Sequence, residues 1–551
     1  MSVESFQFNS ETVALRRGQS LAAALTDAGH RQFRETAKGG TRGIFCGMGV
    51  CQDCLLTVDG APNKRACMTP AAAGMQVQTQ VALAPLTDLP ATVTPAARHI
   101  APDVLVIGGG AGGLNAAIAA AVAGAAVIVL DERKVAGGQY FKQSAGDVGP
   151  LDAQQAEGQA LVVMALTAGV EIIAGVEIWG AFDGPLFLAE HEGGALIAQP
   201  KTAIVATGAY ERPRMVPGWT LPGVMTTGAA QTLWRSYRTL PGKRVAVCGS
   251  GPLNLQVARE LTEGGADVVM VAEGAASPFA QPLAAMALAM AGPALAAKGF
   301  GMLAALRKRG VPIRYGTGLL SVVAEAGALR ATFSGGQSVL VDALCMNDGF
   351  EPQNEILRLL GAAMTFDPAF GHLRCTRDAA MATTVHNLFA VGDCAGLGGA
   401  PAAEVEGQIA GRAAAAVCQG VTLPDATALH TRLRQHRSFQ AKLWAMYQPS
   451  PRSLQSTPDA TIICRCEEIS LGDLRAGIAD KPGHAGTLKR ATRVGMGRCQ
   501  GRYCGPVAAR LVAEQTGQAL DDRSHFAPRV PIKPVSIAVI LAAQEALDGQ
   551  A

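Results

Sequence analysis

The chain has 551 residues, of which 49% are hydrophobic, 17% charged and 5% aromatic, with a formal net charge of +3. This length predicts several folded domains, and the hydrophobic and charged content excludes a largely disordered chain. The near-neutral charge gives no indication of nucleic-acid binding. The N-terminal residues lack a signal-peptide pattern, and the longest apolar stretch, 283–297, is too short to span a membrane. We therefore expect a cytoplasmic protein, whose 13 cysteines indicate metal or redox chemistry rather than disulfides.

Residues 1–88 are expected to form a small α+β module, with a hairpin over 6–15, a helix from Leu21 and a strand over 55–58. A glycine-rich loop carries cysteines in the spacing C-x4-C-x2-C-x12-C, namely Cys46, Cys51, Cys54 and Cys67. This spacing is typical of plant-type [2Fe–2S] sites, and glycine tolerates the tight turns that such a loop needs. The alternative is a structural zinc site or a set of unligated thiols.

A dinucleotide-binding fold is expected over 99–225, continued over 341–420. A strand at 104–107 runs into the pattern G-x-G-x-x-G, followed by a helix and by a second strand that ends at Asp131. The glycines allow a tight turn, close approach to a pyrophosphate and close helix–strand packing, and Asp131 or Glu132 would bind a ribose. The residues predicted to bind the cofactor here are Gly108, Gly110, Ala111, Gly112, Gly113, Asp131, Glu132, Gly138 and Gln139.

Two later segments indicate that this cofactor is FAD. The first is a strand that leads into Ala206, Thr207 and Gly208. The second, NLFAVGD, ends in Gly392 and Asp393 and is similar to the second FAD fingerprint of two-dinucleotide flavoproteins, in which the aspartate binds the ribityl chain or a phosphate. A helix from about Pro401 would direct its positive end at the flavin.

A second dinucleotide fold is expected as an insertion over 226–340. It has Gly249 and Gly251 in its turn and Glu273 at the end of its second strand, but Asn254 at the third glycine position. Binding of a second nucleotide, NAD or ATP, therefore stays open, and Glu273 would favour NADH over NADPH. No C-x-x-C lies between the FAD segments, which argues against a dithiol relay. The apolar stretch 281–306 is either core helix or a hydrophobic surface for a partner subunit.

A helical linker is expected over 421–459 and a small, mainly helical module over 460–551. Its cysteines follow the spacing C-x-C-x32-C-x4-C, namely Cys464, Cys466, Cys499 and Cys504. This resembles the [2Fe–2S] fold of bacterioferritin-associated ferredoxin, although that family has C-x2-C as its second pair. Nearby arginines would offset the negative charge of a cluster, and Ser470 is a candidate helix N-cap. A zinc ion held by all four cysteines is the alternative.

The order of these modules, and several segments, resemble one family over nearly the whole chain. The segments are GGGAGG, ATGAYERP, GWTLPGVMTTGAAQTLW, VGDCAGLGG and TRVGMGRCQGRYCGP. The chain is similar to the α (A/B) subunits of opine oxidases, D-hydroxyproline dehydrogenase, archaeal proline dehydrogenases and hydrogen cyanide synthase, with sarcosine oxidase α as a further relative. The resemblance implies a multidomain α/β flavoprotein with two glutathione-reductase-like Rossmann folds, a fused N-terminal ferredoxin-like domain and a C-terminal domain like bacterioferritin-associated ferredoxin.

The family also implies a division of labour within a hetero-oligomer. A β subunit resembling D-amino-acid oxidase, with its own FAD, would oxidise a CH–NH or CH–NH2 donor. This chain would then pass the electrons through its FAD and two [2Fe–2S] clusters to an external acceptor. The resemblance leaves open an FMN at the partner interface and peripheral attachment to the inner membrane.

Two other functions stay open. The first is a self-contained NADH-dependent reductase that uses the inserted fold, and the second is a zinc-holding scaffold without catalysis. No catalytic residue is assigned, because the nine histidines are scattered along the chain without visible pairing.

Overall fold

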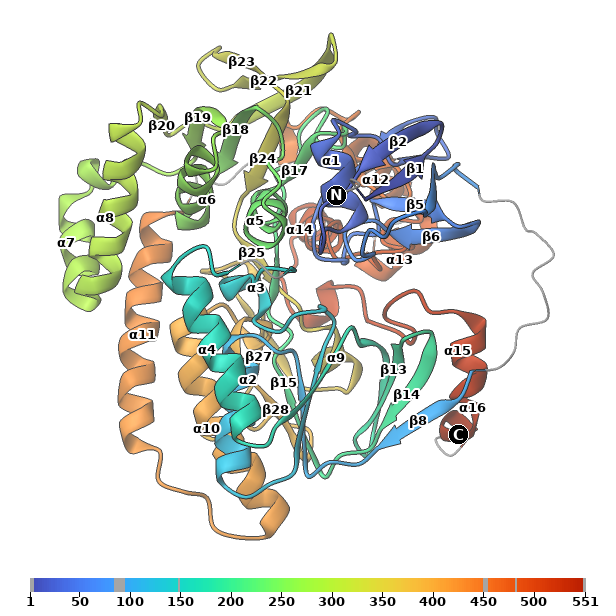
Figure 1. Cartoon of the computed structure of the whole chain (residues 1–551). Helices are drawn as coiled ribbons and strands as arrows, with labels where there is room; N and C mark the ends of the chain where they lie inside the picture. Colours follow the sequence, from blue (N-terminus) through green and yellow to red (C-terminus); the bar gives the residue numbers. More distant parts are fainter. Residues whose placement is uncertain (1–3, 84–94, 147–148, 449–453, 481–482, 549–551) are drawn as a thin grey trace.

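The computed structural model describes residues 4–83, 95–146, 149–448, 454–480 and 483–548. The expected junction between the first two modules, at 88–99, lies largely outside the described residues. In Figure 1 the N-terminal module (blue) sits beside the C-terminal helices (red), above the first dinucleotide fold and next to the inserted one. No helix among the described residues is long and apolar enough to cross a membrane.

The N-terminal module is a five-stranded sheet packed on one helix. In spatial order the strands are β2 (Glu11–Ala14), β1 (Ser5–Phe8), β7 (Gln76–Thr79), β5 (Leu55–Val58) and β6 (Ala61–Arg65). Helix α1 (Leu21–Asp27) is capped by the Ser20 hydroxyl and buries its apolar side chains against the sheet. A two-stranded ribbon, β3 (Arg34–Glu35) and β4 (Thr41–Arg42), leads into the cysteine loop.

The first dinucleotide fold is built on a five-stranded parallel sheet whose inner strands are largely buried. In order they are β11 (Glu171–Ala174), β10 (Val127–Asp131), β9 (Val104–Ile107), β15 (Thr202–Val205) and β28 (Leu388–Ala390). Helices α2 (Ala111–Val122), α4 (Ala153–Thr167) and α10 (Ala400–Gln419) pack together on it. A Cβ on Gly407 would lie 2.2 Å from the Gly112 carbonyl, so glycine allows α2 and α10 to approach backbone to backbone.

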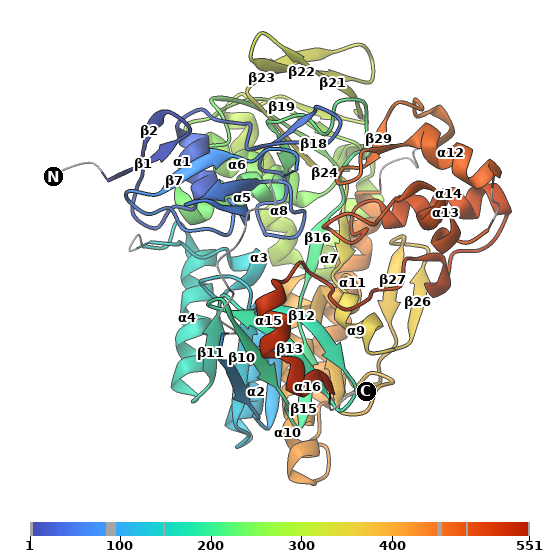
Figure 2. The same cartoon turned by 90° about the vertical axis from the view of Figure 1, so that its right-hand side faces the viewer.

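A second sheet packs on this fold and receives the end of the chain. Its strands are β12 (Glu177–Phe182), β13 (Leu186–His191), β14 (Gly194–Ala198) and β8 (Ala97–Ile100). Helices α15 (Ile537–Ala542) and α16 (Gln544–Asp548) cover it, as Figure 2 shows. The tail of the expected 460–551 module thus lies on the first dinucleotide fold.

The inserted fold is a second parallel sheet with helices. In order it contains β17 (Val224–Thr226), β24 (Ala343–Asn347), β18 (Arg244–Gly249), β19 (Asp267–Glu273) and β20 (Ile313–Tyr315). Strands β17 and β24 thus extend its sheet to either side of the expected range 226–340. Its helices are α5 (Thr227–Tyr237), α6 (Pro252–Glu263), α7 (Pro282–Ala291) and α8 (Pro293–Lys308), and the ribbon β21 (Leu319–Glu325), β22 (Ala328–Phe333) and β23 (Ser338–Val341) lies at its edge.

The apolar stretch 281–306 forms α7 and α8, which project from the body of the protein (Figure 1). Leu283 and Met290 are 76% and 72% exposed, although Leu288 and Leu303 are buried. This pair of helices is therefore not simply core helix, because one side of it is an exposed apolar surface.

The remaining elements connect these folds and build the C-terminal module. The connecting elements are α3 (Gly138–Phe141), β16 (Ala209–Glu211), β25 (Phe350–Pro352), α9 (Glu355–Leu359), β26 (Met364–Asp367), β27 (His372–Cys375), α11 (Thr427–Met446) and the 3-10 turns Pro278–Ala280, Gly392–Ala395, Leu454–Ser456 and Asp522–Ser524. The C-terminal module contains β29 (Ile462–Cys464), β30 (Ile469–Ser470), α12 (Leu471–Asp480), α13 (Ala485–Thr492) and α14 (Gly505–Thr516). The Ser470 hydroxyl accepts a hydrogen bond from the Asp473 amide at 3.1 Å, as an N-cap does.

Candidate redox site

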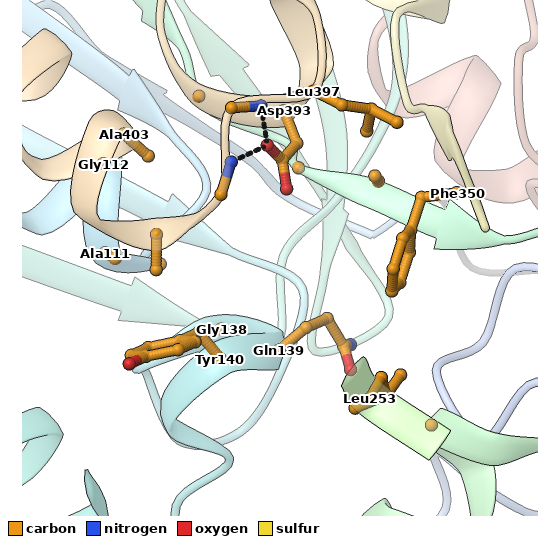
Figure 3. A pocket seen from close by; sticks show the side chains of 18 of the residues that line it. Ala111, Gly112, Gly138, Gln139, Tyr140, Leu253, Phe350, Asp393, Leu397 and Ala403 are labelled. Carbon is orange, nitrogen blue, oxygen red and sulfur yellow. Dashed lines mark hydrogen bonds between the residues drawn. The ribbon is translucent and has the colours of Figure 1, made fainter. Parts of the chain in front are cut away.

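A cavity of about 530 Å³ lies where the two dinucleotide folds, α11 and the N-terminal module meet. Most of the residues predicted to bind FAD line it: Gly108, Gly110, Ala111, Gly112, Asp131, Glu132, Gly138, Gln139, Ala206, Thr207, Gly208, Gly392 and Asp393. Figure 3 shows several of them around the space. Gly113 lies behind the wall, and Gly249, Gly251 and Glu273 do not line this cavity.

The glycine turn after β9 leaves a cradle that side chains would fill. Gly108 has φ +109°, and a Cβ there would lie 2.4 Å from the Ala206 carbonyl. At Gly138, with φ +64°, a Cβ would lie 2.7 Å from the Gly110 Cα. No side chain caps α2, so its first amides are free for an anionic group, and the cradle suits a pyrophosphate.

Two acidic residues stand at the end of β10, and the first of them, Asp131, holds this turn in place. The Asp131 carboxylate accepts hydrogen bonds from the Gly109 amide at 2.6 Å and the Arg133 amide at 2.7 Å. Burial raises the pKa of Asp131, and these amides oppose the shift. Glu132 pairs with Lys533 at 2.5 Å and Arg65 at 3.4 Å. Binding of a ribose by Asp131 or Glu132 stays a prediction.

Asp393 stands at the opposite wall. Its Oδ1 accepts hydrogen bonds from the amides of Gly398 and Gly399, at 2.8 and 2.9 Å, and its other oxygen points into the cavity (Figure 3). Burial raises the pKa of Asp393. Helix α10 begins next to it without a side-chain cap, so its positive end also faces the cavity. These groups suit the polar part of a flavin nucleotide.

A buried charge network behind Asp393 was not predicted from the sequence. Glu406 accepts a hydrogen bond from the Gly392 amide at 2.8 Å and pairs with Arg377 at 2.8 Å and Arg437 at 2.7 Å. Burial alone would raise the pKa of Glu406, but the two arginines lower it below its usual value. Sequence gives no signal for this network, because Arg377 and Arg437 lie 29 and 31 residues from Glu406.

Other cavity residues were also missed. Lys142 is buried and donates hydrogen bonds to the Gly228 carbonyl at 2.7 Å and to the Thr232 hydroxyl at 2.9 Å. Burial lowers the pKa of Lys142 to about 7. Tyr210 lies two residues after Gly208, and its closeness to the Ala206–Gly208 segment could have predicted it.

The inserted fold keeps the geometry of a glycine turn. A Cβ on Gly249 would lie 1.8 Å from the Asn347 carbonyl, so this position requires glycine. Asn254 is buried and bonded, donating to the Asn347 carbonyl at 3.1 Å and accepting from the Thr227 hydroxyl at 2.8 Å. Asn254 therefore cross-links α5, α6 and the end of β24 within this fold.

Glu273 faces its own turn. It accepts hydrogen bonds from the amides of Gly251 at 3.1 Å and Ala275 at 2.9 Å. The Ser250 hydroxyl lies 2.7 Å from the Glu273 carboxylate and 2.6 Å from the Tyr447 carbonyl, so the end of α11 closes over this turn. Burial raises the pKa of Glu273 to about 7.

The four N-terminal cysteines are buried and fall into two contact pairs, Cys46 with Cys51 and Cys54 with Cys67. The amides of Met48 and Cys51 donate to the Cys46 sulfur at 3.5 and 3.4 Å. Burial would raise the pKa of Cys46, but the hydrogen bond with the Cys51 thiol, together with the backbone amides, lowers it to about 7. Cys46 and Met48 also line the cavity, so this loop adjoins the predicted flavin site.

The C-terminal cysteines pair in the same way, Cys464 with Cys504 and Cys466 with Cys499. A Cβ on Gly497 would lie 2.1 Å from the Cys466 Cβ, so glycine is needed there. Within the described residues, no three Cys, His, Asp or Glu side chains form a group that could hold one metal ion. Two pairs of thiolates are the ligands of a [2Fe–2S] cluster, in which each iron is bound by two cysteine thiolates.

Both cysteine sets contribute to one apolar cluster. It includes Phe45, Cys46, Cys51, Tyr210, Trp219, Cys499 and Tyr503, with Cys466 packed against it. The Tyr503 ring lies 5.5 Å from that of Phe45 and 5.4 Å from that of Tyr210, which lines the cavity. The cavity and the two cysteine sets are therefore parts of one continuous buried region.

Comparison with known families now identifies the chain. The pyridine nucleotide-disulphide oxidoreductase profile matches residues 102–420. The chain belongs to this family. Residues 4–82 match the 2Fe-2S iron-sulfur cluster binding domain, and residues 460–544 match the sarcosine oxidase A3 domain. The main fold thus implies FAD and the N-terminal module a [2Fe–2S] cluster.

Individual relatives narrow the family to the one that the sequence motifs predicted. The opine oxidase A-subunit of Agrobacterium tumefaciens is 32% identical over 79% of this chain and 90% of its own length. Hydrogen cyanide synthase subunit HcnB of Pseudomonas aeruginosa is 28% identical, covering 78% and 96%. The shorter subunit HcnA of P. aeruginosa is 38% identical over 76 residues, 14% of this chain and 73% of its own. The chain is a flavin and iron–sulfur oxidoreductase of the opine oxidase A-subunit family.

A solved structure shares the whole architecture. L-proline dehydrogenase from P. horikoshii aligns with a TM-score of 0.74 at 20% identity, covering 98% of this chain and 97% of that one. At this identity the match shows the fold alone. It confirms the predicted multidomain α/β class.

Proposed function

We propose that this chain is the electron-transfer subunit of a heteromeric dehydrogenase for amino acids, imino acids or opines. One observation carries the proposal: the FAD-type cavity touches the first cysteine loop, and that loop shares a core with the second. Two subunits of hydrogen cyanide synthase, HcnA and HcnB, are each similar to this chain, which fits a fusion of two electron carriers. The second cysteine set then holds a second [2Fe–2S] cluster.

The proposed reaction begins outside this chain. A partner subunit, with its own FAD, removes a hydride from carbon and a proton from nitrogen of a CH–NH donor, and water hydrolyses the resulting imine. The two electrons cross this chain to an external acceptor, and the protons go to solvent. Bound FAD would supply the exchange between two-electron and one-electron steps. Asp393 and the start of α10 would position and polarise the nucleotide, and the Glu406 network would keep Asp393 in place.

The exposed face of α7 and α8 is the proposed docking surface for that partner. Phe279, Leu283, Met286 and Met290 are all more than half exposed, and Leu295 and Phe300 belong both to this face and to the cavity wall. Residues 274–318 contain five basic and no acidic residues. We therefore expect an apolar partner surface with an acidic rim, placed at the mouth of the flavin-type cavity.

Paired substitutions test this surface with the purified partner. The double variant Leu283→Ser/Met290→Ser should weaken complex formation at least tenfold, as measured by sedimentation velocity. The control is Val421→Ser/Leu423→Ser, which changes two exposed apolar residues just beyond the C-terminal end of α10 and should leave complex formation unchanged. If the two double variants bind the partner subunit equally well, the proposed docking surface is wrong. Binding of this face to anionic vesicles or to a second copy, without partner binding, would assign it to the membrane or to self-association instead.

The second candidate function is a self-contained NADH-dependent reductase. The glycine turn at Gly249 and the acid at Glu273 favour it. Anaerobic visible spectra separate the two. The proposal expects no bleaching of flavin and iron–sulfur bands with NADH, but bleaching with dithionite and with partner plus an opine, proline or sarcosine. Prompt bleaching by NADH alone would overturn it. Chromatography of acid-released nucleotides tests whether FMN, NAD or ATP accompanies FAD.

A further inference from the structure

One ion pair lies directly between the two cysteine sets. Asp53 stands between Cys51 and Cys54, and Arg465 between Cys464 and Cys466. The Arg465 Nε donates to the Asp53 Oδ2 at 2.6 Å, with side chains 4% and 1% exposed. The residues are 412 positions apart, so only the fold brings them together.

The guanidinium of Arg465 is held on every side. It stacks over the rings of Phe45, at 3.9 Å, and Trp219, at 4.7 Å. It also donates to the Trp219 carbonyl at 2.9 Å. Asp53 is held as firmly, because its Oδ1 accepts from Arg34 at 3.0 Å. Both charges are therefore fixed in a region where the dielectric response is low.

A second buried pair joins the same two modules and provides a control. Arg42 donates to Glu468 at 3.1 Å, and Glu468 also accepts from the Thr36 hydroxyl at 2.9 Å and the Lys38 amide at 3.1 Å. This pair already fastens the modules to each other. The Asp53–Arg465 pair, in contrast, lies within both cysteine loops, with Asp53 directly before Cys54 and Arg465 between Cys464 and Cys466.

We propose that the Asp53–Arg465 pair couples the two cluster sites, fixing their loops against each other and balancing the charge between them, so that each residue sets the reduction potential of both clusters. The inference rests on the proposed function, in which both cysteine sets hold [2Fe–2S] clusters. Reduction adds one negative charge to a cluster, and a fixed buried charge nearby opposes or favours that step according to its sign.

The test is a redox titration of the complete chain, followed by electron paramagnetic resonance. Asp53→Asn removes the negative charge and should raise the potentials of both clusters. Arg465→Gln removes the positive charge and should lower both, while Arg465→Lys should restore values near wild type. Glu468→Gln should raise mainly the potential of the C-terminal cluster, because Glu468 lies two residues after Cys466 and outside the N-terminal cysteine loop. If Asp53 and Arg465 had only a structural role, all variants would shift the potentials in the same direction or lose the resonance signal.

The outcomes separate this inference from the proposed function. A single resonance from wild-type protein that carries iron and sulfide for one cluster means that the second cluster is absent, and both ideas fail. Two resonances whose potentials do not move, move in the same direction, or move only in the nearer cluster overturn the coupling alone. If Asp53→Asn does not assemble clusters, the comparison of Arg465→Gln with Arg465→Lys still shows whether loss of the positive charge lowers both cluster potentials.

Discussion

The sharpest single-site prediction concerns the third glycine of the first turn. A Cβ at Gly113 would lie 1.8 Å from the Gly108 carbonyl oxygen, which belongs to the backbone and cannot rotate away. To reach the 3.0 Å that Cβ atoms keep, helix and turn must separate by about 1.2 Å. Helix α2 cannot simply retreat, because its Gly112 carbonyl already meets Gly407 of α10.

We therefore expect Gly113→Ala to cost about 3 kcal/mol, the upper part of the range for overpacked cores. Displacement of the α2 amides should also release FAD. Urea unfolding and the FAD-to-protein ratio measure the two effects. Gly301→Ala is the control, because no atom lies within 4 Å of its Cβ and alanine favours a helix, so it should stabilise by about 0.5–1 kcal/mol. A Gly113→Ala protein that keeps both FAD and wild-type stability would refute this reasoning.

Three further predictions follow from the buried charges and thiols. Glu406→Gln should destabilise by about 3 kcal/mol in urea, because it leaves two arginines poorly paired, while Glu263→Gln at the surface should change little. Glu273 has a pKa of about 7 in the folded protein, above its unfolded value, so the free energy of unfolding of the wild type should fall as pH rises from about 4.5 to 7. Glu273→Gln should remove about 2–3 kcal/mol of that fall. Parallel pH profiles of unfolding for the two proteins would contradict this. Cys499→Ser should lose about half of the bound iron, whereas Cys248→Ser, in the core of the inserted fold, should keep all of it, which iron analysis can show.

Local patterns in the sequence predicted the local parts of the site. The strand at 104–107, the turn at Gly108 and the acid at Asp131 follow one another in the chain, so their spacing is enough to place them. The cysteine spacings likewise predicted two compact loops. The resemblance to opine oxidase subunits predicted the order of the modules, and the comparisons confirmed it.

Contacts between distant segments could not be predicted in this way. Nothing in the sequence pairs Asp53 with Arg465, or Glu132 with Lys533, because such pairs depend on how whole modules dock. The same holds for α15, whose apolar residues gave no sign that they would return to the first dinucleotide fold. Composition alone also left the placement of α7 open, since an apolar helix suits a core or an interface equally.

The central claim is that one flavin and two iron–sulfur clusters share this chain, and an electron count tests it most directly. Anaerobic titration of the purified chain with dithionite, followed in the visible range, gives the number of electrons taken up per FAD. The account predicts about four, two for the flavin and one for each [2Fe–2S] cluster. About three would mean that one of the two cysteine sets holds no cluster, and about two would leave a flavoprotein without an electron path through either cysteine set.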